Sequence, residues 1–99
     1  MSEAEPNKYS QIIEGVFFDN YVEGAHSVPF TRQEFEEKSK ELGIATPKNL
    51  GDVIYSFRYR YELPDALLAK QPAGLQWVIF PAKMRPAEYR FAAVPFSTV

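Results

Sequence analysis

The most informative run in the chain reads Pro47-Lys-Asn-Leu-Gly-Asp-Val-Ile-Tyr-Ser-Phe-Arg-Tyr-Arg60. Its apolar residues recur at intervals of three and four positions, which places them on one stripe of a helix. The stripe consists of Leu50, Val53, Ile54 and Phe57. Asn49 directly precedes it, where its side chain can accept hydrogen bonds from the amides of the first turn. The run therefore predicts a helix over about residues 49–60.

The face opposite the stripe has an unusual composition for a surface helix, which ordinarily presents Glu and Lys. Tyrosine and serine hydroxyls predominate, with guanidinium groups on the flanks, and such groups hydrogen-bond, stack and pair with phosphate. The outward residues are Asp52, Tyr55, Ser56 and Tyr59, and the flanking residues are Arg58 and Arg60. This pattern is typical of a recognition helix. The alternative is an ordinary amphipathic helix whose tyrosines cover neighbouring loops.

Size and composition indicate one folded domain. The chain has 99 residues, of which 45% are hydrophobic and 15% aromatic, enough for a single core. The absence of cysteine excludes disulfides and thiolate metal sites. Residues 1–7 form a polar lead without the apolar run of a signal peptide, and no stretch has the length of a membrane span. We expect a cytoplasmic protein with no membrane contact.

The charge is distributed unevenly along the chain, although the net charge is only −2. Residues 1–47 carry four basic and nine acidic side chains, for a net charge of −5. Residues 48–99 carry seven basic and four acidic side chains, for a net charge of +3. This asymmetry indicates contact with a polyanion on one side, but the excess is smaller than in a strong non-specific binder of nucleic acid.

Two helices and a short strand are predicted before the central run. Helical spacing of apolar residues extends over about residues 8–22, and Gly24 is placed to end that helix. Residues 27–30 favour an edge strand because of Pro29. Thr31-Arg-Gln-Glu34 then matches a capping box, and the helix that it opens runs to about Leu42, followed by Gly43. A short turn over residues 45–48 leads into the central helix, as in a helix-turn-helix.

The C-terminal part of the chain predicts a hairpin. Residues 63–74 form a brief irregular or single-turn segment, and residues 75–80 and 89–94 have the aromatic and β-branched composition of strands. An eight-residue loop, 81–88, joins these strands. The order of helix, short strand, helix, helix and hairpin predicts an α+β winged helix-turn-helix that is mostly helical with a small antiparallel sheet. It would occupy residues 8–99 as a single domain after a disordered lead, residues 1–7.

Several of these segments together resemble the N-terminal region of a bacterial family of restriction-type endonucleases. The resemblance is carried by Tyr9–Phe18, Val28–Phe35, Pro47–Arg60, Leu63-Pro64 and the strands around Trp77–Phe80 and Tyr89–Phe91, with Gly51–Arg60 as its most specific part. It implies a winged-helix DNA-binding domain at the N-terminus of a longer protein, ahead of a C-terminal nuclease domain. The expected wing, residues 82–87, departs from the family's pattern because it is less glycine-rich than the resemblance implies.

The sequence offers no convincing catalytic constellation. Asp65 with Glu88 and Arg90 imitates a metal-dependent nuclease motif, but Arg90 stands where a lysine base is required, and arginine stays charged. His26 is the only histidine and follows Gly24 and Ala25, as a turn residue would. With no cysteine and no second histidine, a transition-metal site is not expected. We expect no enzymatic activity, no cofactor and no small-molecule substrate in this chain.

If the chain binds duplex DNA, the central helix would enter the major groove with its N-terminal residues toward the bases. The residues placed closest to DNA are Lys48, Asn49, Asp52, Tyr55, Ser56 and Tyr59. Asn49 is expected to cap the helix, which leaves Tyr55 and Ser56 as the better candidates for base contacts. Candidates for phosphate contacts are Lys48, Arg58 and Arg60, with Arg32 at the start of the second helix and Lys83 and Arg85 at the wing tip.

Two other hypotheses fit the same sequence. A winged helix can bind a protein through its surfaces, and a net acidic domain suits that use. The chain can also be a structural cap that packs on the rest of a larger protein. Each arginine taken singly can be an ordinary surface residue.

Overall fold

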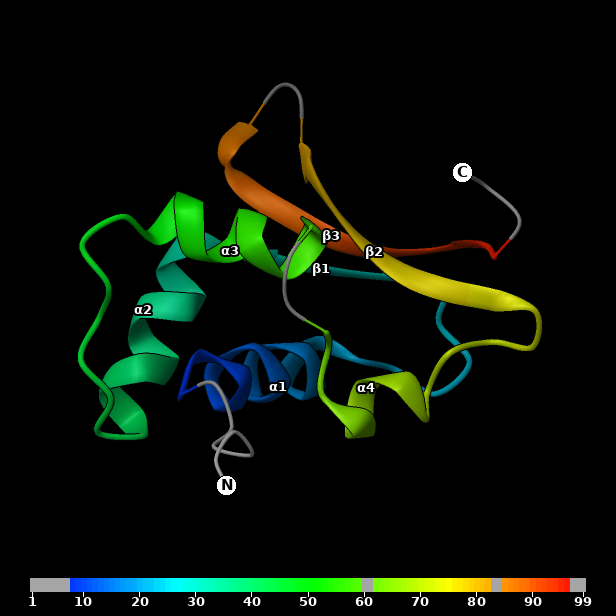
Figure 1. Ribbon diagram of the computed structural model, residues 1–99, viewed down its shortest axis with the longest axis horizontal. Coiled ribbons are helices and arrows are strands. Elements are labelled where there is room, and N and C mark those ends of the chain that lie inside the picture. The colour runs from blue at the N-terminus through cyan, green and yellow to red at the C-terminus, as the bar shows by residue number, and fades with distance from the viewer. Residues whose placement is uncertain (1–7, 60–61, 83–84, 97–99) are drawn as a thin grey trace.

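The computed structural model describes residues 8–59, 62–82 and 85–96, and the side chains at 58–59 and 85–86 lie outside this description. Within these residues the chain forms four helices and one three-stranded sheet (Figure 1). In chain order the elements are α1 (Lys8–Asn20), β1 (Ser27–Thr31), α2 (Arg32–Glu41), α3 (Leu50–Tyr59), α4 (Asp65–Leu68), β2 (Leu75–Ala82) and β3 (Arg85–Pro95). The predicted α+β class and the order of the elements are confirmed.

The sheet is antiparallel, with β3 between β1 and β2. Its register places Val28, Phe91 and Ile79 side by side, so these three residues point to the same face. On the opposite face, Pro29 and Arg90 are exposed to solvent. As predicted, Pro29 lies in an edge strand, where its missing N–H does not interrupt a ladder on both sides.

One hydrophobic core joins the helices to the inward face of the sheet. Phe17 of α1 lies at its centre, with ring centroids 5.1 Å from Phe91 and 5.4 Å from Trp77. The Trp77 indole N–H donates to the carbonyl of Leu67 at 3.0 Å, which fixes the single turn of α4 against β2. In Figure 1, α1 and α4 lie together on one side of the molecule, away from α3.

The predicted capping box at the start of α2 is present. Thr31 Oγ1 accepts from the Glu34 amide at 3.1 Å, and the Glu34 carboxylate accepts from the Thr31 amide at 3.1 Å. The same carboxylate also accepts from Asn20 Nδ2 at 3.2 Å.

The first helix, α1, ends at Asn20, so it is shorter than the predicted 8–22. Gly24, expected to end it, adopts φ +86° in the turn that follows.

The connection between α2 and α3 is longer than a helix-turn-helix turn of three to four residues, since it spans residues 42–49. It is held to α2 by Ser39, whose hydroxyl lies 2.7 Å from that of Thr46. Ser39 is fully buried, and its hydroxyl also donates to the Glu36 carbonyl, so the burial leaves no orphaned polar group. The expectation of a short turn was therefore wrong.

The predicted eight-residue loop over 81–88 was also wrong. β2 continues to Ala82, β3 begins at Arg85, and these two residues are paired. The pattern of prolines concealed this continuity, because Pro81 and Pro86 each read locally as breaks in a strand. A register shift at Pro81/Ala82 absorbs the irregularity. In Figure 1, the adjoining ends of β2 and β3 lie above α3.

Candidate nucleic-acid interface

The N-terminus of α3 is exposed and capped by its preceding residue. Asn49 Oδ1 accepts from the Asp52 amide at 3.0 Å, which confirms that Asn49 serves as the cap. Lys48, Asn49 and Asp52 are all exposed. The first turn of α3 therefore presents one cation, one amide and one carboxylate to the surroundings.

The structure separates the two residues that were expected to contact bases. Tyr55 is 55% exposed and lies on the outer face of α3, as predicted. Ser56 is only 7% exposed, and its hydroxyl donates to the Asp52 carbonyl at 2.9 Å. The placement of Ser56 on the outer face was wrong, because the buried arc of α3 is wider than the stripe of large apolar residues.

Arg32 belongs to the same surface through a contact that the sequence did not reveal. Its Nη2 donates to the Tyr89 hydroxyl of β3 at 3.2 Å. This hydrogen bond, reinforced by the charge interaction with Tyr89 and by Glu36, raises the pKa of Arg32. Gly51 of α3 lies against the pair, since a Cβ at position 51 would be 3.4 Å from Arg32 Nη2. Three separate elements therefore meet around Arg32.

Two residues of this surface were missed as site residues, and each carried a weak signal. Tyr89 stands two positions before Phe91, so the alternation of a strand places both side chains on the inward face. This pattern does not indicate that the Tyr89 hydroxyl reaches α2. Gly51 stands in the first turn of a helix, where alanine would be more favourable by about 1 kcal/mol, and such a glycine can mark close approach of another element.

A small recess lies beside this contact, between α3 and the hairpin. Its volume is about 90 Å³. The lining residues are Gly51, Ile54, Tyr55, Ile79, Pro81 and Tyr89. The lining of the recess is mostly hydrocarbon, whereas the N-terminus of α3 carries exposed charged side chains.

The remaining predicted DNA contacts fall where the structure gives no side-chain positions. Arg58 and Tyr59 lie in α3 and Arg85 begins β3, but their side chains are outside the described part. Arg60 and Lys83 lie wholly outside the described residues. The described part of the candidate interface is thus α3 from its N-terminus to Tyr55, with Arg32 and Tyr89.

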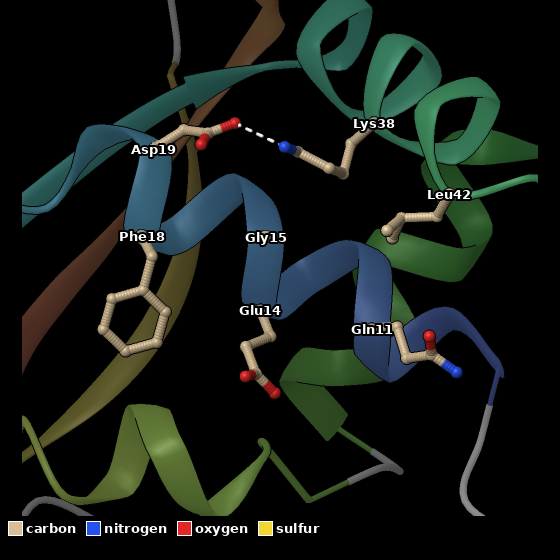
Figure 2. A pocket seen from close by; sticks show the side chains of 7 residues that line it. All are labelled: Gln11, Glu14, Gly15, Phe18, Asp19, Lys38 and Leu42. Atoms are coloured by element: carbon tan, nitrogen blue, oxygen red, sulfur yellow. Dashed lines mark ion pairs between the residues drawn. The ribbon is translucent and has the colours of Figure 1, made fainter.

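A second surface feature lies between α1 and α2 (Figure 2), and it shares no lining residue with the recess. This groove has a volume of about 370 Å³, and Phe18 and Leu42 lie at its edge, 39% and 42% exposed. Lys38 crosses it and forms ion pairs with Asp19 and Glu41, both at 2.9 Å.

The candidates for chemistry are not brought together. Among the described residues, no group of three His, Asp or Glu side chains could hold a metal ion. His26 is exposed, with Nδ1 3.2 Å from the Gly24 carbonyl oxygen. Within the same residues, none of the helices has the length and apolar character needed to span a membrane.

Comparison of the chain with models of known protein families, with curated proteins and with solved structures found no match.

Proposed function

We propose that this chain is a winged-helix module that binds duplex DNA, with α3 as the recognition helix and the β2–β3 hairpin as the wing. The observation that carries the proposal is the meeting of the exposed N-terminus of α3 with Arg32 and Tyr89, where Tyr89 pairs with Pro81 near the end of β2. A recognition helix directs its N-terminal residues to base edges, while arginines beside it hold phosphates.

The topology supports the same assignment. A strand between the first two helices pairs with the last of the described strands, and the hairpin follows the third helix after a connection over residues 60–74 that contains the single turn of α4. The long connection over residues 42–49 departs from a compact helix-turn-helix. The proposal therefore rests on the placement of α3 and the hairpin more than on the turn itself.

The positions of these side chains indicate that some would contact bases and others phosphates. Lys48, Asp52 and Tyr55 would face the bases, and Arg32 would hold a phosphate in an orientation fixed by Tyr89. Arg58, Arg60, Lys83 and Arg85 would supply further phosphate contacts. Since the chain has a net charge of −2, its own affinity for DNA would be modest. The resemblance to the N-terminal region of restriction-type endonucleases supports the proposal that it targets a partner nuclease domain to DNA.

The test is fluorescence anisotropy of labelled duplex DNA titrated with the chain at low and at near-physiological salt. We expect binding that weakens with salt, because released counterions contribute to affinity. The double variant Arg58→Glu/Arg85→Glu should abolish it while the circular dichroism spectrum stays unchanged. A matched variant with the same change of charge, Lys40→Glu/Lys70→Glu, should retain most of the affinity. Absence of binding at low salt to random-sequence duplexes, with and without base methylation, would reject the proposal.

A second function, protein binding, is favoured by one observation, the groove between α1 and α2. Phe18 and Leu42 are large apolar side chains exposed at its edge, as at a docking site. A photo-reactive phenylalanine derivative at position 18 should then crosslink to a protein in cells, and the same group at exposed Gln33 should not. Equal crosslinking from both positions would argue against this groove.

A further inference from the structure

The recess beside α3 has an apolar floor and a more exposed rim. Ile54 and Ile79 form the floor, with exposed fractions of 1% and 3%. Tyr55 and Pro81 form an exposed part of the rim, and Gly51 opens the wall on the helix side by having no side chain. Such a site takes an apolar group that enters from solvent.

The polar groups close to the recess already form hydrogen bonds or lie at its edge. The Tyr89 hydroxyl accepts from Arg32, so it faces the guanidinium. A polar ligand inside the recess would have to give up its hydrogen bonds to water against Ile54 and Ile79, which is costly. The lining of the recess therefore favours an apolar ligand group over a polar one.

The volume restricts the ligand further. An apolar cavity of roughly 150 Å³ is large enough for benzene, and one water occupies roughly 30 Å³ of liquid. A recess of about 90 Å³ is therefore too small for a whole flipped base, and it accommodates a methyl group with the edge of the ring that bears it. This comparison excludes this recess as a pocket for a flipped base.

The position of the recess on α3 indicates which methyl group of DNA could reach it. Gly51 lies in the first turn of α3, the part of a recognition helix that approaches base edges, and Tyr55 lies one turn further along at the middle of the helix. In the major groove, the apolar group that a base edge presents is the 5-methyl of thymine, and 5-methylcytosine presents the same group. We propose that this recess binds the 5-methyl group of a pyrimidine in the major groove, an inference that rests on the proposed DNA binding.

Gly51 provides a variant that blocks the recess without loss of the fold. A Cβ at this position would lie 3.4 Å from Arg32 Nη2 and 3.7 Å from Tyr89 Oη, both ordinary contacts. Alanine is also the better helix former. Gly51→Ala should therefore remain folded with a methyl group placed at the wall of the recess. Gly15→Ala in α1 is the control, because it makes the same substitution in the groove between α1 and α2 (Figure 2), which shares no lining residue with the recess.

The experiment begins with selection of tight-binding duplexes from a randomised library that contains thymine and 5-methylcytosine. The selected duplexes are then remade with one methyl removed at a time, by uracil for thymine or cytosine for 5-methylcytosine, and titrated by anisotropy. We expect removal of one methyl to weaken binding about fourfold, which corresponds to about 0.8 kcal/mol for one buried carbon. The effect should persist in Gly15→Ala and disappear in Gly51→Ala.

The outcomes separate this inference from the proposed function. Loss at a thymine position or at a methylated cytosine position supports the inference and identifies the source of the methyl group. Binding that no single methyl removal changes, or a methyl effect that persists in Gly51→Ala, overturns the inference and leaves DNA binding intact. Failure of every duplex to bind at low salt rejects DNA binding and the methyl site with it.

Discussion

Arg32 Nη2 and Tyr89 Oη, 57 residues apart in the chain, lie 3.2 Å from each other. The contact joins the first residue of α2 to the central strand of the sheet, next to the N-terminus of α3. A long, flexible arginine side chain is thereby held in one direction before any ligand arrives. Such preorganisation lowers the entropy lost on binding, since immobilising a side chain costs about 0.5–1.5 kcal/mol.

This contact leads to a prediction about salt dependence. If Arg32 holds a phosphate, Arg32→Ala should weaken DNA binding and reduce the slope of log K against log salt by about 0.9. Tyr89→Phe keeps the charge, so it should weaken binding by a few fold and leave the slope unchanged. Titrations at several salt concentrations measure both quantities. An Arg32→Ala variant with the wild-type slope would show that Arg32 contacts no phosphate.

The capping box predicts a loss of stability that depends on one hydroxyl. Thr31→Ala should lower the free energy of unfolding by about 1 kcal/mol, because the Glu34 amide loses its acceptor. Thr31→Ser retains the hydroxyl and serves as the matched control. Urea denaturation measures both variants. Equal destabilisation by the two substitutions would mean that the methyl group of Thr31, and not the cap, contributes the stability.

Gly15 allows Lys38 to lie across α1. A Cβ at position 15 would be 2.8 Å from Lys38 Cδ, so Gly15→Ala should displace the lysine side chain from Asp19. The gain in helix propensity, about 1 kcal/mol, should offset much of the lost contact, so the net change in stability should be small. A double-mutant cycle with Asp19→Asn is the sharper measurement. We expect Asp19→Asn to have an effect in wild type and none in Gly15→Ala.

Lys38 also predicts a dependence of stability on pH. Its hydrogen bond to Asp19, and next that to Glu41, raise the pKa of Lys38 above the ordinary value of 10.5. A lysine whose pKa is raised on folding stabilises the fold below pH 10.5, and this contribution is lost as the pH rises through the folded-state pKa. The destabilisation caused by Lys38→Met should therefore be larger at about pH 8 than at about pH 12.

The control for that pH series is Asp19→Asn, which removes the first cause of the raised pKa. In the Asp19→Asn background, the destabilisation caused by Lys38→Met should vary less with pH, because only Glu41 remains as an ion-pair partner. Differences between paired variants are measured because tyrosines also ionise in this range. A pH dependence that is unaffected by Asp19→Asn would contradict the assigned cause.

Local interactions were predicted well from the sequence. The capping box at Thr31 and the cap at Asn49 involve residues three positions apart, so the pattern of residue types specifies them almost completely. The edge position of Pro29 follows from its missing N–H. Ser56 was misplaced because helical periodicity gives the direction of the buried face but not its width, which depends on the elements packed against it.

The sequence by itself determined the helices, their caps and the α+β class, because these depend on contacts within a few residues and on apolar periodicity. Only the tertiary structure decided that Arg32 meets Tyr89, that Lys38 crosses Gly15, and that Gly51 opens a recess over Ile54 and Ile79. Each of these relationships joins segments far apart in the chain. Their geometry depends on how the whole core packs, and no local pattern of residues encodes that packing.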